Sequence, residues 1–122
     1  MSGNSRAIAI ARSYDLPDAD GHYRVLVDRL WPRGVTKDSL QLDRWTKELA
    51  PSDKLRQWFD HDPNKWAEFR KRFLHELSQH KDSAYELLRA ADGKSILLIY
   101  AAKDEQHNNA VVLKEYLERL QP

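Results

Sequence analysis

Polar side chains of the types that carry chemistry gather in two clusters, and each cluster directly follows an apolar run. The first run, residues 23–27, leads into Asp28-Arg29-Leu30-Trp31-Pro32-Arg33-Gly34. The second run, residues 95–100, leads into residues 101–109, which read Ala-Ala-Lys-Asp-Glu-Gln-His-Asn-Asn. In open α/β sheets, ligands bind beyond the carboxyl ends of the strands. We therefore expect both clusters to contribute to one pocket if the two runs form strands of one sheet.

The first cluster places two guanidinium groups and an indole on a restrained loop. The proline fixes its own φ and favours an extended residue before it, and the glycine permits a turn that other residues resist. Arg29 and Arg33 each offer a planar fork of donors that suits a carboxylate or a phosphate, and Trp31 offers a face for ring stacking. The alternative is structural: Arg29 pairs with Asp28 or Asp43, and Trp31 only packs.

The second cluster has the residues of a helix start together with a candidate proton carrier. Asp104 is a suitable N-cap that would accept the backbone N–H of His107. His107 beside this acid is a candidate general base. Lys103 and Asn108 are candidate ligand contacts, and the ring of Tyr100 is a candidate packing surface for a ligand. In the structural alternative, Asp104 and His107 only cap the helix.

A third candidate is His61, which two aspartates flank in Asp60-His61-Asp62-Pro63. Neighbouring carboxylates favour the protonated imidazole. His61 is a candidate base, metal ligand or ligand contact, although an ordinary surface turn explains it as well. The chain has no cysteine, no compact metal-ligand spacing and no glycine-rich phosphate loop. We therefore predict no metal site, and the sequence indicates no particular cofactor.

Composition restricts the class of protein. The 122 residues are 41% hydrophobic, and 20 Lys and Arg nearly balance 19 Asp and Glu, for a net charge of +1. This balance disfavours nucleic-acid binding and membrane-surface binding, since both need a basic field. The basic run 70–72 is explained by a solvated helix face. No apolar stretch is long enough to span a membrane. We expect a cytoplasmic protein with a flexible tail over 1–5 and one domain over 6–122.

Apolar patterning predicts an α/β fold with a small, at least partly parallel sheet of three strands, near residues 7–12, 23–28 and 95–101. The last strand is apolar throughout, which is typical of a strand covered on both faces. Whether the first two strands pair antiparallel or are joined by an irregular connection stays open. Helix patterns and caps, among them Thr36, Ser52, Asp62 and Ser83, predict helices near 36–41, 53–60, 63–79, 83–91 and 105–120.

Three long segments resemble the YeaO-like proteins, a bacterial family of small proteins of unknown function. The likeness runs through residues 23–34, 58–63 and 98–113, and it covers nearly the whole chain from about Ile8 to Leu120. Lys103 and Gln106 depart from the pattern, in which Arg and Glu are expected. The resemblance implies a small single-domain cytosolic protein. It implies no reaction, because the family has no established activity.

Two functions from different classes fit these residues. In the first, the protein is an enzyme for a small anionic or nucleotide-like substrate, and His107 moves a proton together with Asp104 or Asp28. In the second, the protein senses a ligand or contacts a partner without catalysis, and the same arginines hold an anionic group. Nucleic-acid binding is a third and weaker alternative. The sequence fixes neither the oligomeric state nor the ligand.

Overall fold

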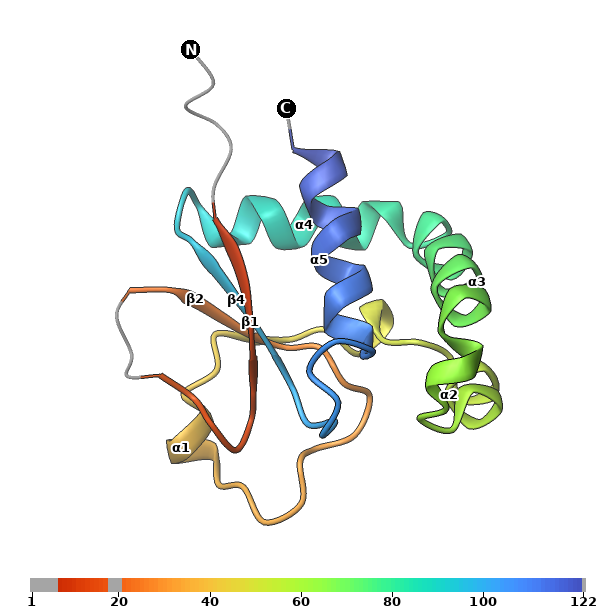
Figure 1. Cartoon of the computed structure of the whole chain (residues 1–122). Helices are drawn as coiled ribbons and strands as arrows, with labels where there is room; N and C mark the ends of the chain where they lie inside the picture. Colours follow the sequence, from red (N-terminus) through yellow and green to blue (C-terminus); the bar gives the residue numbers. More distant parts are fainter. Residues whose placement is uncertain (1–6, 18–20, 122) are drawn as a thin grey trace.

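The computed structural model describes residues 7–17 and 21–121 (Figure 1). The predicted tail over 1–5 lies outside the described residues. The strands are β1 (Ile8–Arg12), β2 (Tyr23–Leu26), β3 (Arg44–Trp45) and β4 (Ile96–Tyr100). The helices are α1 (Lys37–Leu40), α2 (Asp53–Phe59), α3 (Trp66–Ser78), α4 (Lys81–Ala91) and α5 (Asn109–Leu120), with short 3-10 helices at Lys47–Leu49 and Pro63–Lys65.

The strands form one sheet in the order β1-β4-β2-β3, and every pairing is parallel. This confirms the predicted α/β class and the parallel sheet. The predicted count of three strands is wrong by one. The missed strand, β3, has only two residues, which pair with Val25 and Leu26, and so short a segment carries no periodic signal.

The connection between β1 and β2 resolves the alternative that the sequence left open. These two strands are not neighbours, because β4 enters between them and pairs with both. In the described part of this connection, residues 13–17, 21 and 22, there is no helix. Sequence order and spatial order differ here, and the carboxyl ends of β2 and β4, which carry the two polar clusters, become adjacent.

Side-chain alternation along β4 divides the core between the two faces of the sheet. Ile96, Leu98 and Tyr100 pack among the helices α2, α3, α4 and α5. Leu97 and Ile99 face the other side, where Leu40 of α1, Trp31 of the loop after β2 and Trp45 of β3 cover them. Figure 1 shows α5 crossing the sheet, with α4 and α3 beyond it and α1 on its own near the foot of the sheet. β4 is thus a central strand covered on both faces, as its composition predicts.

Three of the predicted caps hold their helices. The side chains of Thr36, Ser52 and Asp62 accept the backbone N–H groups of Ser39, Leu55 and Asn64. Asp62 first caps a 3-10 turn, and α3 follows it. The predicted helix over 63–79 is therefore a 3-10 turn followed by an α-helix.

Two predicted helix starts are wrong. The helix predicted from residue 83 begins at Lys81, because the backbone N–H of Ala84 already bonds the carbonyl of His80, and Ser83 lies inside the helix. The helix predicted from residue 105 begins at Asn109. Asn108 is extended, with φ −136° and ψ 167°, and its Oδ1 accepts the N–H of Val111. Asn108 therefore has the N-cap role that we predicted for Asp104.

Among the described residues, no helix combines the length and the apolar character that a membrane crossing requires.

Candidate functional site

The two polar clusters meet where β2 and β4 end. Asp28 Oδ2 accepts the backbone N–H of Ala101 at 2.9 Å, and Asp28 Oδ1 accepts Asn109 Nδ2 at 3.0 Å. Asn109 Nδ2 also donates to the carbonyl of Val27 at 3.0 Å. The carboxylate of Asp28 thus joins the exit of β2 to the exit of β4 and to the first residue of α5.

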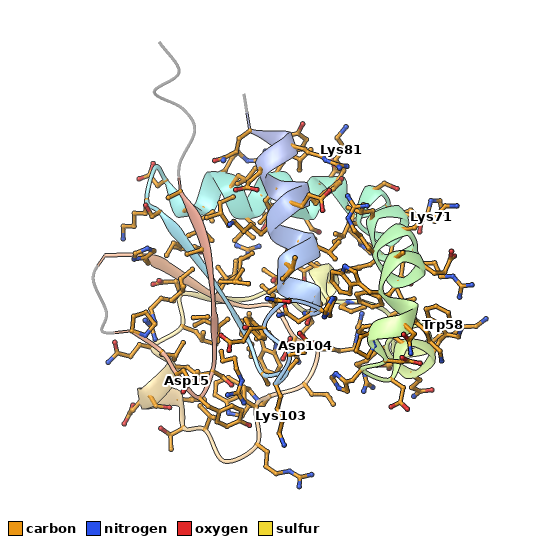
Figure 2. The ribbon with its side chains drawn as sticks, viewed as in Figure 1. Asp15, Trp58, Lys71, Lys81, Lys103 and Asp104 are labelled. Atoms are coloured by element: carbon orange, nitrogen blue, oxygen red, sulfur yellow. The ribbon has the colours of Figure 1, made fainter. Side chains whose placement is uncertain are left out.

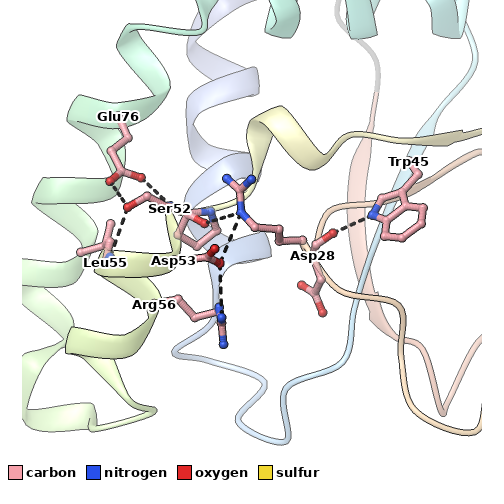
Figure 3. Close-up of polar contacts among 9 residues, drawn as sticks. Asp28, Trp45, Ser52, Asp53, Leu55, Arg56 and Glu76 are labelled. Atoms are coloured by element: carbon pink, nitrogen blue, oxygen red, sulfur yellow. Dashed lines mark hydrogen bonds and ion pairs between the residues drawn. The ribbon is translucent and has the colours of Figure 1, made fainter.

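Two indoles hold the loop that follows β2. Trp45 Nε1 donates to the carbonyl of Asp28 at 2.7 Å (Figure 3), and Trp31 Nε1 donates to the carbonyl of Val35 at 2.6 Å. The two indoles contact each other edge to face, with ring centroids 5.5 Å apart. Gly34 at φ +76° completes the turn. The sequence predicted this restraint from the proline and the glycine but could not indicate the role of Trp45.

A cavity of about 300 Å³ lies over these strand ends. It combines apolar and aromatic walls with charged groups of both signs. Its lining residues are Asp28, Arg29, Leu30, Trp31, Pro32, Arg33, Pro51, Arg56, Phe59, His61, Phe69, Ala101, Ala102, His107, Asn108 and Asn109.

The three arginines of this cavity have different surroundings. Arg29 Nε lies 3.4 Å from the carbonyl of Pro51 and 3.8 Å from Asp53 Oδ1. Arg56 shares the same Asp53 oxygen at 3.3 Å (Figure 3). The guanidinium of Arg33 has no ion-pair or hydrogen-bond partner among the described residues. One carboxylate therefore serves two arginines, and Arg33 is left to solvent or to a ligand.

The imidazole of His107 is oriented by Asp104. His107 Nδ1 lies 2.9 Å from Asp104 Oδ2, and the ring packs edge to face on Trp66 with centroids 5.2 Å apart. The backbone N–H groups of Gln106 and His107 both donate to Asp104 Oδ1. These donors, first the Gln106 N–H and then the His107 ring, lower the pKa of Asp104. Asp104 itself does not line the cavity; it positions His107, which does.

Asp28 differs from Asp104 in its electrostatic setting. Burial raises the pKa of the Asp28 carboxyl, and the hydrogen bonds from Asn109 and Ala101 and the charge of His61 partly oppose that rise. Asp28 and Asp104 are thus shifted in opposite directions. Such divergence between nearby carboxyl groups is typical of functional sites, although structural networks produce it as well.

The third candidate, His61, reaches the cavity from the turn after α2. Asp60 and His61 both have left-handed backbone conformations, with φ +47° and +54°. Two consecutive non-glycine residues in this region are sterically unfavourable. The turn brings the exposed imidazole of His61 to the cavity rim, with its ring centroid 6.5 Å from that of Phe59.

Not every predicted site residue lines the cavity. Tyr100 lies in the core with 2% of its surface exposed, and Lys103 is exposed and points away from the fold (Figure 2). Asn108 lines the cavity, but its side chain is bonded to Asp104 O and to the Val111 N–H. The residues found together there are Asp28, Arg29, Trp31, Arg33, His61, His107 and Asn108.

Sequence reasoning missed the wall that α2 and α3 supply, formed by Pro51, Arg56, Phe59 and Phe69. Arg56 and Phe59 belong to an ordinary capped helix, and nothing local marks them as site residues. Asn109 stood in the second cluster, but its contact with Asp28 has no local signal either. Within the described ranges, no three His, Asp or Glu side chains gather closely enough to hold a metal ion.

The basic run on α3 has mostly internal partners. Arg70 is paired with Glu115 of α5, and Arg72 Nε lies 2.8 Å from Glu68 Oε2. Arg72 also covers the ring of Trp58, with Cζ 4.3 Å from the centroid.

Comparison with known proteins places the chain in a family. Residues 7–121 match the family described as the inactive DUF488-N3 subclade. The chain is 42% identical to the uncharacterized protein YeaO of Escherichia coli K12, over 93% of this chain and 98% of the relative. It is 38% identical to the uncharacterized protein Rv3073c of Mycobacterium tuberculosis H37Rv, over 90% and 92%. No solved structure gave a significant match. The chain belongs to the YeaO-like proteins of the DUF488-N3 subclade.

Proposed function

We propose that the protein binds a small anionic ligand in the cavity at the ends of β2 and β4 and does not convert it chemically. The observation that carries this proposal is the set of cations around the cavity. Arg29, Arg33 and Arg56 line it together with two histidines, and Asp28 is the one carboxylate among the lining residues. The carboxylate is itself held by two N–H donors, which reduces its repulsion of an anion.

Arg33 has the main role in this proposal. Arg29 and Arg56 share Asp53, whereas Arg33 has no partner in the part of the chain that the structure describes. A guanidinium binds carboxylate or phosphate through paired, charge-assisted hydrogen bonds. A ligand anion therefore supplies the hydrogen-bond acceptors that the Arg33 guanidinium lacks. Arg56 is the second exposed guanidinium among the lining residues.

The walls indicate that the ligand also has an apolar or ring-shaped part. Trp31, Phe59 and Phe69 contribute aromatic surface to the cavity, and Pro32 and Pro51 add rigid apolar surface. A volume of about 300 Å³ is at the lower end of the range for sites of small organic ligands. A bare ion would leave these walls without contacts.

Binding without turnover is favoured by the family and by the roles of the polar groups. The subclade is described as inactive. Asp104 is engaged by two backbone N–H groups of its own loop, and its contact with His107 completes that loop. Both residues thus stabilise this loop, and that structural role explains their positions without a reaction.

Isothermal titration calorimetry tests the proposal. Inorganic phosphate, phenyl phosphate and benzoate are titrated into wild type, Arg33→Ala and the control Arg89→Ala, whose exposed side chain lies on α4. We expect at least one organic anion to bind wild type and Arg89→Ala equally, and Arg33→Ala to bind it roughly tenfold more weakly, as loss of a charge-assisted bond predicts. Equal affinity in Arg33→Ala, or no binding of any of these anions, would overturn the proposal.

The His107–Asp104 pair favours a second candidate, an enzyme that acts on the same class of ligand. Asp104 fixes the tautomer of His107 and leaves Nε2 available as a base. NMR spectra of the bound anion, followed over time, decide between the two functions. Product formation that His107→Ala abolishes, with binding retained, supports the enzyme. An unchanged ligand supports binding alone.

A further inference from the structure

The polar character of the cavity changes from its mouth to its floor. Arg33, Arg56 and His61 are exposed residues at the mouth. Asp28 and Asn109 are half-buried at the strand ends, where the backbones of β2 and β4 bring them together. The exposed side chains at the mouth are therefore positively charged or hydrogen-bond donors, whereas the one lining carboxylate, Asp28, is half-buried, as Arg29 and His107 also are. An anion can bind at the mouth, but Asp28 repels it from the floor.

The floor presents unused hydrogen-bond acceptors. Each oxygen of Asp28 receives one N–H, from Ala101 and from Asn109, and a carboxylate oxygen has lone pairs for a second donor. Asn109 Nδ2 donates to Val27 O and to Asp28 Oδ1, and these two bonds fix the orientation of the amide. The other amide atom, the Oδ1 of Asn109, is an acceptor. That Oδ1 has no partner elsewhere in the described ranges. Both N–H groups that contact Asp28 donate to it, so the carboxylate oxygens are acceptors in both hydrogen bonds.

We infer that the ligand is a phosphate ester of a polyhydroxylated compound, a sugar phosphate in the simplest case, with its phosphate at Arg33 and Arg56 and its hydroxyl groups at Asp28 and Asn109. This inference rests on the proposed function, and it adds the chemical class of the ligand. The phosphate satisfies the guanidinium groups at the mouth. Hydroxyl groups donate to the acceptors at the floor, and the carbon skeleton lies along Trp31 and Phe59.

Asp28 is the specificity-determining residue in this arrangement. An anion of the same shape without hydroxyl groups would displace water from Asp28 and offer no donor in return. Sites built to bond a ligand hydroxyl discriminate strongly against the analogue that lacks it, because their buried polar groups are then left unpaired. The cavity should therefore distinguish ligands by their hydroxyl groups as well as by their charge.

A matched pair of ligands measures this selectivity. Methyl β-ribofuranoside 5-phosphate has a five-membered ring, hydroxyl groups and a phosphate. Tetrahydrofurfuryl phosphate keeps the ring and the phosphate and lacks the hydroxyl groups. In titrations of the whole chain at neutral pH, we expect the riboside phosphate to bind roughly tenfold more tightly or better. Asp28→Asn should reduce this preference severalfold, and Asp38→Asn, a control on the exposed surface of α1, should leave it unchanged.

The outcomes separate this inference from the proposed function. Equal affinity for the two phosphates in wild type overturns the inference and leaves anion binding intact. Failure of every anion to bind overturns both. A preference that persists at full size in folded Asp28→Asn shows that another residue reads the hydroxyl groups and overturns the role of Asp28. If Asp28→Asn does not fold, the wild-type comparison still decides the ligand class.

Discussion

Asp28 and Asn109 lie 81 positions apart in the chain and are joined by a 3.0 Å hydrogen bond. Through this bond the exit of β2 is fixed to the start of α5, and the same amide also holds the carbonyl of Val27. The contact makes one site out of two separate segments. It also orients the carboxylate that forms the floor of the cavity.

Asn109→Ala tests how much that contact contributes to the stability of the fold. The variant leaves Val27 O and Asp28 Oδ1 without their shared donor, and a buried acceptor without a partner costs about 1–3 kcal/mol. We expect urea denaturation to show a loss of that size in the free energy of unfolding. Asn64→Ala, on an exposed 3-10 turn, is the control and should change stability little. A loss no greater than that of the control would contradict the role given to Asn109.

Ser52→Ala should destabilise the wall of the cavity. Ser52 Oγ caps α2 through the N–H of Leu55 at 3.1 Å and also contacts Glu76 Oε2 of α3 at 2.6 Å (Figure 3). Loss of a helix cap costs about 1–2 kcal/mol. Ser78→Ala is the matched control, because its exposed hydroxyl bonds only the carbonyl of His75 in its own helix. Thermal unfolding monitored by circular dichroism should separate the two variants clearly.

The pKa values of Asp28 and Asp104 should be shifted in opposite directions from that of an ordinary aspartate. Burial raises the pKa of Asp28, and hydrogen bonds from Gln106 and His107 lower the pKa of Asp104. Asp104 therefore contributes stability above its unfolded pKa, and this contribution is lost as the pH falls through its lowered folded value. Asp28 has the opposite sign: its contribution is present below the unfolded pKa and is lost as the pH rises through the raised folded value.

Carboxyl carbon NMR titration measures this order directly. Asp28→Asn and Asp104→Asn identify the two signals, since each variant removes one of them. We expect the Asp104 signal to titrate at lower pH than the Asp28 signal. The reverse order would show that burial at the strand ends is weaker than the structure indicates.

Core packing beneath the site gives a prediction that compares a buried leucine with an exposed one. Leu98 of β4 has none of its surface exposed, and replacement of such a leucine by alanine costs about 2–5 kcal/mol. Leu30, on the loop after β2, is 62% exposed. Leu98→Ala should lower the urea midpoint strongly, whereas Leu30→Ala should leave it nearly unchanged. Similar losses in both variants would mean that the loop is packed more tightly than its exposure indicates.

Errors in the predicted elements follow from competition between local signals and long-range bonds. Asp104 and Asn108 both have cap chemistry, and the extended backbone of Asn108 decides that α5 starts after it. Ser83 has capping-box spacing, but α3 passes into α4 through Gln79 and His80, so α4 starts earlier. β3 exists only because Arg44 and Trp45 pair with β2. None of these outcomes can be determined from a short segment alone.

Seven of the predicted site residues line one cavity, and that cavity extends beyond the two polar clusters. The clusters after β2 and β4 contain Asp28, Arg29, Arg33 and His107, and polar residues after an apolar strand are visible in the sequence. Tyr100 belongs to the same string, but strand alternation directs it into the core. Arg56 on the opposite wall has no local mark, because an arginine on a short amphipathic helix is ordinary.

The sequence by itself determined the α/β class, the apolar central strand, three of the helix caps and the position of the polar clusters. These features depend on residues close together in the chain, where alternation, cap side chains and proline or glycine act locally. The tertiary structure alone decided that β4 enters between β1 and β2, that Asn109 reaches Asp28 and that α2 supplies the far wall. Those relationships come from pairing and packing across as many as 90 positions, for example between Arg12 and Ala102, and no short window of sequence contains both partners.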